Sequence, residues 1–133
     1  MKAVAARLTR GLNIGSKCFA SDNSGARIVR ITGIKHGKGT KGRQQAAKIG
    51  DWVKVSVREG NPELKGQVFD AVVIRQRKPY LRRTGERIAF TDNAVAILKD
   101  EKGNPKGTQI KGAVPREVQE RWKEVAKIAQ FIV

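Results

Sequence analysis

The segment from Asp51 to Arg58, DWVKVSVR, alternates apolar and polar residues and is the cleanest periodic stretch of the chain. Successive side chains of a β-strand point to opposite faces, so an alternation of period two predicts a strand that is buried on one face. We expect Val53, Val55 and Val57 to point into a core. The residues between them then face solvent or a ligand.

Five other segments have the same period or form short apolar runs of strand length. They are Ser16 to Ala20, Ala26 to Ile34, Val68 to Gln76, Arg87 to Phe90 and Ala94 to Leu98. Turn-forming sequences separate them, namely DNSG, EGNPELKG, TDN and DEKGNPKG. Short strands with this regular punctuation predict a small antiparallel barrel.

The pattern changes from Pro115 onward, where apolar residues recur at helical spacing. The apolar positions are Val118, Trp122, Val125, Ile128 and Ala129. Proline suits the first position of a helix, so Pro115 marks the expected start. We expect the apolar stripe to pack on the barrel, the alternative being a groove on a partner. The opposite face carries nearly balanced charges and is not expected to be the main contact with nucleic acid.

The chain is 133 residues long and 39% hydrophobic, which predicts one domain with a single modest core. Cys18 is the only cysteine, which excludes an internal disulfide, and we expect it to be a small buried apolar residue. No apolar run is long enough to span a bilayer, and the first residues lack a secretory signal. We expect a soluble protein of a reducing, intracellular compartment.

Charge is the strongest indication of function. The chain carries 28 Lys and Arg against 12 Asp and Glu, a net charge of +16. Such an excess destabilises a compact chain by self-repulsion, and a polyanionic partner is its simplest explanation. Nucleic acid is the favoured partner, although composition alone does not separate DNA, RNA and an anionic membrane surface.

The positive charge is concentrated in two runs. The first, KHGKGTKGRQQAAK, lies in a stretch without acids and predicts a flexible loop that binds phosphate through Lys35, Lys38, Lys41, Arg43 and Lys48. The second contains Glu86 as its only acid, and its expected RNA contacts are Arg75, Arg77, Lys78, Arg82, Arg83 and Arg87. We expect Arg75 and Arg77 to project from one face and Tyr80 to offer a stacking surface.

No residue pattern indicates catalysis. The glycines at 37–42 match G-x-G-x-x-G, but the residues that follow leave no room for the helix that would bind a pyrophosphate. His36 has no partner at metal-ligand spacing, and it is interpreted as another phosphate or base contact. Seven aromatic residues, with no pair exposed on one strand, argue against the stacking platform of an RNA recognition motif. We therefore expect no catalytic residue, no metal and no cofactor.

Several longer segments resemble the universal L-fourteen family of large ribosomal subunit proteins. They are SDNSGARIVRI, GDWVKVSVREG, KGQVFDAVVIRQRKPYLRRTGERIAFTDNAVAIL and GTQIKGAVPREV, in the order that this family shows. The resemblance extends from about Leu12 to Val133. Thr84, the sequence Gly112-Ala113-Val114 and the longer amino-terminal segment depart from bacterial members and resemble the archaeal and eukaryotic branch.

The resemblance implies a mainly β fold, with a closed five-stranded antiparallel barrel, a projecting β-ribbon and a carboxy-terminal α-helical region. Within a single domain at 1–133, we expect the barrel, basic loop and ribbon over about 12–111 and the helical region over 112–133. It further implies a structural constituent of the large ribosomal subunit, without enzymatic activity, in the cytoplasm.

The family's partners are also implied. They are large-subunit rRNA near the subunit interface, the L-three family ribosomal protein, small-subunit rRNA across an intersubunit bridge, and the anti-association initiation factor. On this chain the surface for that factor would include Arg116, Glu117, Glu120, Arg121 and Lys123. Two alternatives remain, a free RNA-binding factor that cycles on and off RNA and an enzyme that binds a nucleotide at the glycine-rich loop.

Overall fold

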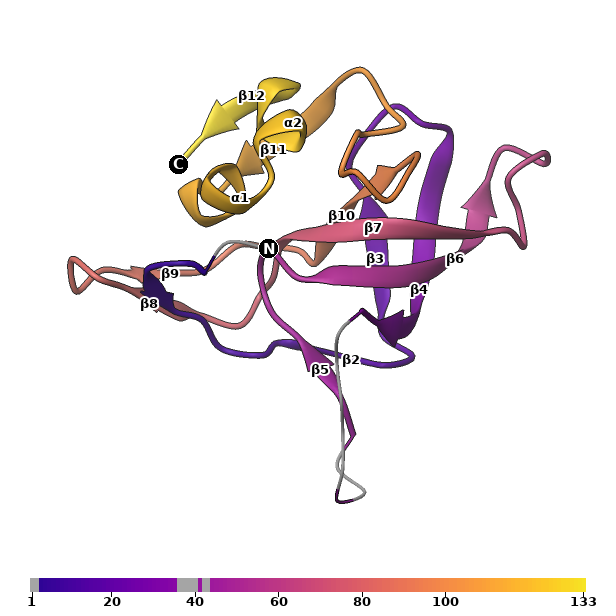
Figure 1. Cartoon of the computed structure of the whole chain (residues 1–133). Coiled ribbons are helices and arrows are strands. Elements are labelled where there is room, and N and C mark those ends of the chain that lie inside the picture. Colours follow the sequence, from indigo (N-terminus) through magenta and orange to yellow (C-terminus); the bar gives the residue numbers. More distant parts are fainter. Residues whose placement is uncertain (1–2, 36–40, 42–43) are drawn as a thin grey trace.

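The computed structural model describes residues 3–35, 41 and 44–133, which form a mainly β structure (Figure 1). The strands are β1 (Ala6–Arg7), β2 (Leu12–Asn13), β3 (Lys17–Ala20), β4 (Ala26–Ile34), β5 (Ala46–Ala47), β6 (Trp52–Gly60), β7 (Val68–Arg75), β8 (Tyr80–Arg82), β9 (Arg87–Ile88), β10 (Ala94–Leu98), β11 (Ile110–Val114) and β12 (Ala129–Ile132). The helices are α1 (Arg116–Arg121) and α2 (Lys123–Lys127). All six predicted strands form, with ends that differ by at most two residues.

Five of these strands close into a barrel in the order β10-β3-β4-β6-β7. Barrel strands that follow one another along the chain, from β3 through β4, β6 and β7 to β10, pair antiparallel, as predicted. The closing pair, β10 with β3, is parallel. An odd number of strands requires this, because the first and last strands of a five-stranded up-and-down path run in the same direction.

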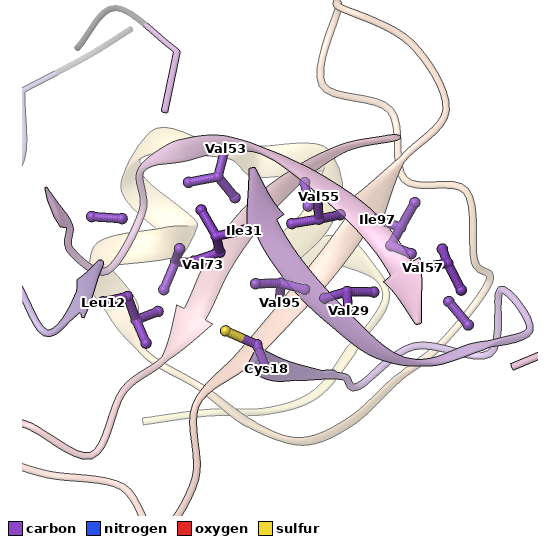
Figure 2. Close-up of a cluster of buried hydrophobic side chains, with 13 residues drawn as sticks. Leu12, Cys18, Val29, Ile31, Val53, Val55, Val57, Val73, Val95 and Ile97 are labelled. Carbon is purple, nitrogen blue, oxygen red and sulfur yellow. The ribbon is translucent and has the colours of Figure 1, made fainter. Parts of the chain in front are cut away.

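The inside of the barrel is filled by the residues that the alternation selects. Val53, Val55 and Val57 are at most 1% exposed and point inward with Cys18 and Val29 (Figure 2). The intervening residues of β6 are partly or fully exposed. The alternation of period two therefore correctly identified the core face of this strand.

A second apolar cluster covers the outer face of the barrel, so the prediction of a single core was wrong. Strands β7 and β10 are buried on both faces: Val73 and Val95 face the barrel interior, whereas Val72 and Ala96 contribute to the second cluster. The carboxy-terminal elements cover that outer face (Figure 1). Strands buried on two sides lose polar alternation and appear in sequence as continuous apolar runs, as AVAIL does in β10.

The predicted carboxy-terminal helix is two short helices followed by a strand. Trp122 separates α1 from α2, because its backbone leaves the helical conformation with φ −126° and ψ 77°. Its indole Nε1 donates to the Gly50 carbonyl at 2.8 Å, which fixes the side chain at this joint. Pro115 lies one residue earlier than predicted, at the N-cap. The apolar stripe packs on the barrel as expected, through Val118, Trp122 and Val125.

The ribbon forms a small sheet of its own, in the order β1-β8-β9, and extends away from the barrel (Figure 1). The two-stranded sheet of β2 and β5 lies at the base of the basic loop. None of the helices in the described residues is long and apolar enough to cross a membrane.

Candidate nucleic-acid interface

The predicted cations of the ribbon divide into an exposed and a buried group. Arg77, Lys78, Arg83 and Arg87 are exposed. Arg75 and Arg82 are each only 8% exposed, so the expectation that they lie open to RNA was wrong. Both guanidinium groups are held by acids and carbonyls from distant parts of the chain, which explains why a burial of positive charge is tolerated here.

Arg75 joins the end of β7 to the loop before β10 and to β11. Its Nε donates to Asp92 Oδ1 at 2.9 Å, and Nη1 donates to the carbonyls of Lys111 and Ala113 at 3.0 Å each. Nη2 donates to the Ser21 hydroxyl. A guanidinium has five donors in a fixed plane, and here that plane organises three backbone segments.

Arg82 belongs to a second buried network, with Tyr80 and Glu117. Its Nε donates to Glu117 Oε1 and the Tyr80 hydroxyl donates to Oε2, both at 2.8 Å. Nη2 of Arg82 also donates to the Val133 carbonyl at 2.7 Å. Burial, and then the hydrogen bond and charge of Glu117, raise the pKa of Tyr80 far above its usual value.

This network corrects two further expectations. Tyr80 is 1% exposed, so it offers no stacking surface. Glu117 is 5% exposed and does not belong to an open charged face. The network instead connects the ribbon to α1, which stabilises the orientation of the exposed ribbon cations.

The basic loop is described only at its two ends and at Lys41, which is exposed. Lys38, Arg43 and His36 lie outside the described residues. The Lys35 ammonium lies 4.6 Å from the centre of the Trp52 ring, which itself meets Trp122 edge-on at 6.0 Å. Lys48 is partly exposed, and its backbone N–H donates to Asp51 Oδ2 at 3.0 Å. These contacts fix both ends of the loop on the barrel.

The predicted protein-contact residues of the carboxy-terminal region also differ in exposure. Arg116, Glu120 and Lys123 are exposed. Arg121 is partly buried, with its Nη1 at 3.3 Å from the Gly50 carbonyl and 3.4 Å from Asp51 Oδ1. The exposed members remain available to a partner, and Arg121 is available only through its accessible part.

The outer face of β3 and β4 carries basic residues that the sequence analysis did not select. Lys17, Arg27 and Arg30 are exposed there, and Lys17 lies directly opposite Arg30 in the antiparallel pair. The sequence did contain a signal for their exposure, because each of these residues is next to a position that the alternation of period two assigns to the core. The charges are spread along two strands, however, and do not form a run.

The side chains of seven of the twelve acids accept a hydrogen bond or form a salt bridge within the described part of the chain. Salt bridges at 4.0 Å or less hold Asp51, Asp70, Asp92, Glu117 and Glu124. The exposed cations of the ribbon and of the β3–β4 face have no such bridge within the described part of the chain. Their charge therefore remains available to an anion outside the protein.

Cys18 has none of the features of a reactive thiol. It is 3% exposed, and burial raises the pKa of Cys18 to about 12, so the thiolate is disfavoured at neutral pH. The residue instead packs in the barrel interior (Figure 2), as predicted.

Comparison with known proteins identifies the family of the chain. The family model "Ribosomal protein L14p/L23e" matches residues 11–133. Large ribosomal subunit protein uL14 of Nanoarchaeum equitans is 50% identical over the full length of both chains. The uL14 proteins of Halobacterium salinarum and Methanothrix thermoacetophila are 47% and 45% identical, again over the full length of both chains. These three relatives are archaeal, in agreement with the branch that the sequence departures indicate. A match of this extent and identity shows that the chain belongs to the ribosomal protein L14p/L23e family.

Proposed function

We propose that this ribosomal protein is a structural constituent of the large subunit in the cytoplasm and binds large-subunit rRNA through three basic surfaces. These are the loop at 35–48, the exposed side of the ribbon and the outer face of β3 and β4. The observation that carries the proposal is the contrast between paired acids and exposed cations without an internal bridge. Phosphate is the anion that such separate surfaces would meet on folded RNA.

In this proposal the cations differ in role. Arg77, Lys78, Arg83 and Arg87 contact phosphate directly, as do Lys35, Lys38, Lys41, Arg43 and Lys48 of the loop. Arg75 and Arg82 act indirectly, because their buried hydrogen bonds hold the ribbon and strand ends in place. Binding relies on charge and shape, since side chains do not easily enter the deep groove of an A-form helix.

The proposal includes the position at the subunit interface that the family resemblance implies. There the protein adjoins the L-three family protein and contributes to a bridge with small-subunit rRNA. The anti-association initiation factor meets the carboxy-terminal surface at Arg116, Glu120, Lys123 and the accessible part of Arg121. Their mixed charge supports this assignment, because the surface differs from the β3–β4 face, whose charged residues are all basic. The protein carries out no catalysis and needs no cofactor.

The salt dependence of RNA binding tests the central part of the proposal. If the chain neutralises about seven phosphates, the slope of log affinity against log salt is about −5 to −6. Replacing Arg77, Arg83 and Arg87 together with Gln should lower the affinity for protein-free large-subunit rRNA and make the slope shallower by about 2 to 3. Replacing Arg116, Lys123 and Lys127 with Gln is the matched control, with the same change in charge and a smaller effect expected. A wild-type slope near −1, or equal effects of the two triple variants, would contradict the proposed interface.

Sedimentation of a native lysate through a high-salt gradient shows whether the chain is a structural constituent of the subunit or a factor that cycles on and off RNA. We expect about one copy of the chain to remain with each large subunit. Recovery of the chain at the top of the gradient would favour the cycling factor.

A further inference from the structure

Phe19 is an exposed aromatic residue on the basic face of the barrel. Its neighbour Cys18 points into the core, so Phe19 points outward, on the same side of β3 as Lys17. It is 47% exposed, although a phenylalanine on a strand is usually buried. Its cross-strand partner, Ile28, is only partly buried and extends the apolar surface next to it.

Four segments that each carry an exposed cation meet near this position. Lys17 lies two residues away on the same strand, opposite Arg30 on β4. The Phe19 N–H donates to the Asn93 carbonyl at 3.0 Å, and the Arg77 N–H donates to the side-chain oxygen of the same Asn93 at 2.9 Å. The Lys111 N–H donates to the carbonyl of Ser21, two residues beyond Phe19. None of these cations has a salt bridge within the described residues.

This combination identifies the chemistry of the ligand. An apolar protein surface would leave several cations desolvated and without partners, which is costly. A single-stranded nucleotide supplies both an aromatic face for the ring and phosphates for the cations. The exposed Phe131 differs from Phe19 in its neighbours, because the residues that follow it, Ile132 and Val133, are exposed apolar residues and not cations.

Building on the proposed function, we propose that Phe19 is a base-stacking residue for an unpaired nucleotide of the bound RNA. Lys17, Arg30 and Arg77 bind the phosphates on either side of that nucleotide. The ring is well placed for stacking, because β3 is hydrogen-bonded to a strand on each side within the closed barrel and rigid elements hold functional side chains more precisely than loops do. One ring is sufficient for one base, so no second exposed aromatic on the same strand is required.

Equilibrium binding of the full chain to protein-free large-subunit rRNA, measured at several salt concentrations, tests this role. A stacked base is worth about 1–3 kcal/mol by alanine substitution, so Phe19→Ala should weaken binding by about 5- to 150-fold. Phe19→Leu keeps an apolar side chain but lacks a π-face, and it should also weaken binding. Phe19→Trp should retain wild-type affinity. Val68→Ala, which truncates an apolar side chain that is 57% exposed on β7, is the control and should change nothing.

The salt slope distinguishes stacking from a general disturbance of the surface. Stacking releases no counterions, so Phe19→Ala and Phe19→Leu should keep the wild-type slope while the affinity falls. A changed slope in these variants would overturn the stacking role, because it would mean that phosphate contacts had moved. Wild-type affinity in both variants would also overturn it, and a protein contact would then be the better explanation of the exposed ring. A wild-type slope near −1 would instead contradict the proposed RNA interface itself.

Discussion

At the scale of single residues, the position of Cys18 inside the barrel determines how its thiol responds to pH. Burial raises the pKa of Cys18 from an ordinary 9.0 to about 12. A raised pKa in the folded state means that the unfolded chain loses its proton first as the pH rises. The contribution to stability is therefore complete below pH 9 and is lost progressively between about pH 9 and pH 12.

The variant Cys18→Val isolates this effect, because it keeps an apolar side chain and removes the ionisable group. Between pH 8 and pH 10.5, the free energy of unfolding of the wild type should fall by about 2 kcal/mol more than that of the variant. Urea unfolding at the two pH values measures the difference. All other ionisable groups are the same in both proteins, so their contributions cancel. An equal loss in the two proteins would show that Cys18 is accessible to solvent.

Glu117 illustrates how a buried charge depends on its partner. Arg82 is only 8% exposed, and Glu117→Ala removes the carboxylate that pairs with its guanidinium. The substitution also removes the acceptor of the Tyr80 hydroxyl. We expect the free energy of unfolding to fall by about 3–5 kcal/mol. Glu120→Ala, an exposed position on the same helix, should cost less than about 0.5 kcal/mol. Chemical denaturation of both variants checks the prediction, which a similar cost at the two positions would refute.

At the scale of elements, two glycines with positive φ make different demands on the chain. Gly60 ends β6 opposite Ala26, with φ 152°, and a Cβ added there would lie 2.6 Å from the Gly25 carbonyl oxygen and 2.9 Å from the Ala26 Cα. Gly66 has φ 84°, but a Cβ would meet nothing within 4 Å. The first position therefore combines backbone strain with a clash, whereas the second has strain alone.

Alanine at these two positions should separate the two costs. Gly66→Ala should lower the free energy of unfolding by about 1–2 kcal/mol, the usual penalty for a side chain in the left-handed region. Gly60→Ala should cost about 1–3 kcal/mol more, because the backbone at the start of β4 has to shift. Urea unfolding measures both, and the slope of the transition shows whether the folded state has changed. If Gly60→Ala lowered the free energy of unfolding less than Gly66→Ala does, the inference that β4 and β6 approach closely at Gly60 would be wrong.

The predictability of the elements follows from the range of the interactions that form them. Strands such as β6 and β10 have local signals in their alternation or apolar runs, and the sequence identified both. The break at Trp122 was missed because it depends on Gly50, 72 residues away. The buried roles of Arg75 and Arg82 were missed because their acids lie 17 and 35 residues away. A basic run predicts where cations are, but a distant carboxylate decides which of them reach solvent.

At the scale of the whole molecule, the charge of +16 acts on stability and on binding in opposite directions. Self-repulsion destabilises the free folded chain, and added salt relieves it, since charges more than about 10 Å apart are screened at 0.1 M. The same salt weakens RNA binding by restoring the competition of counterions for phosphate. The free protein should therefore become more stable, and the complex weaker, over one range of salt concentration.

A charge-neutralising variant on the β3–β4 face tests this opposition. With Lys17, Arg27 and Arg30 replaced by Gln, the urea midpoint of the free chain should rise at low salt, and the gain should shrink as salt screens the remaining charges. The affinity for protein-free large-subunit rRNA should fall, with a salt slope shallower by about 2 to 3. If the variant were less stable than the wild type at low salt, these cations would have stabilising contacts within the fold. They would then belong with Arg75 and Arg82, and the charge available to RNA would be confined to the ribbon and the basic loop.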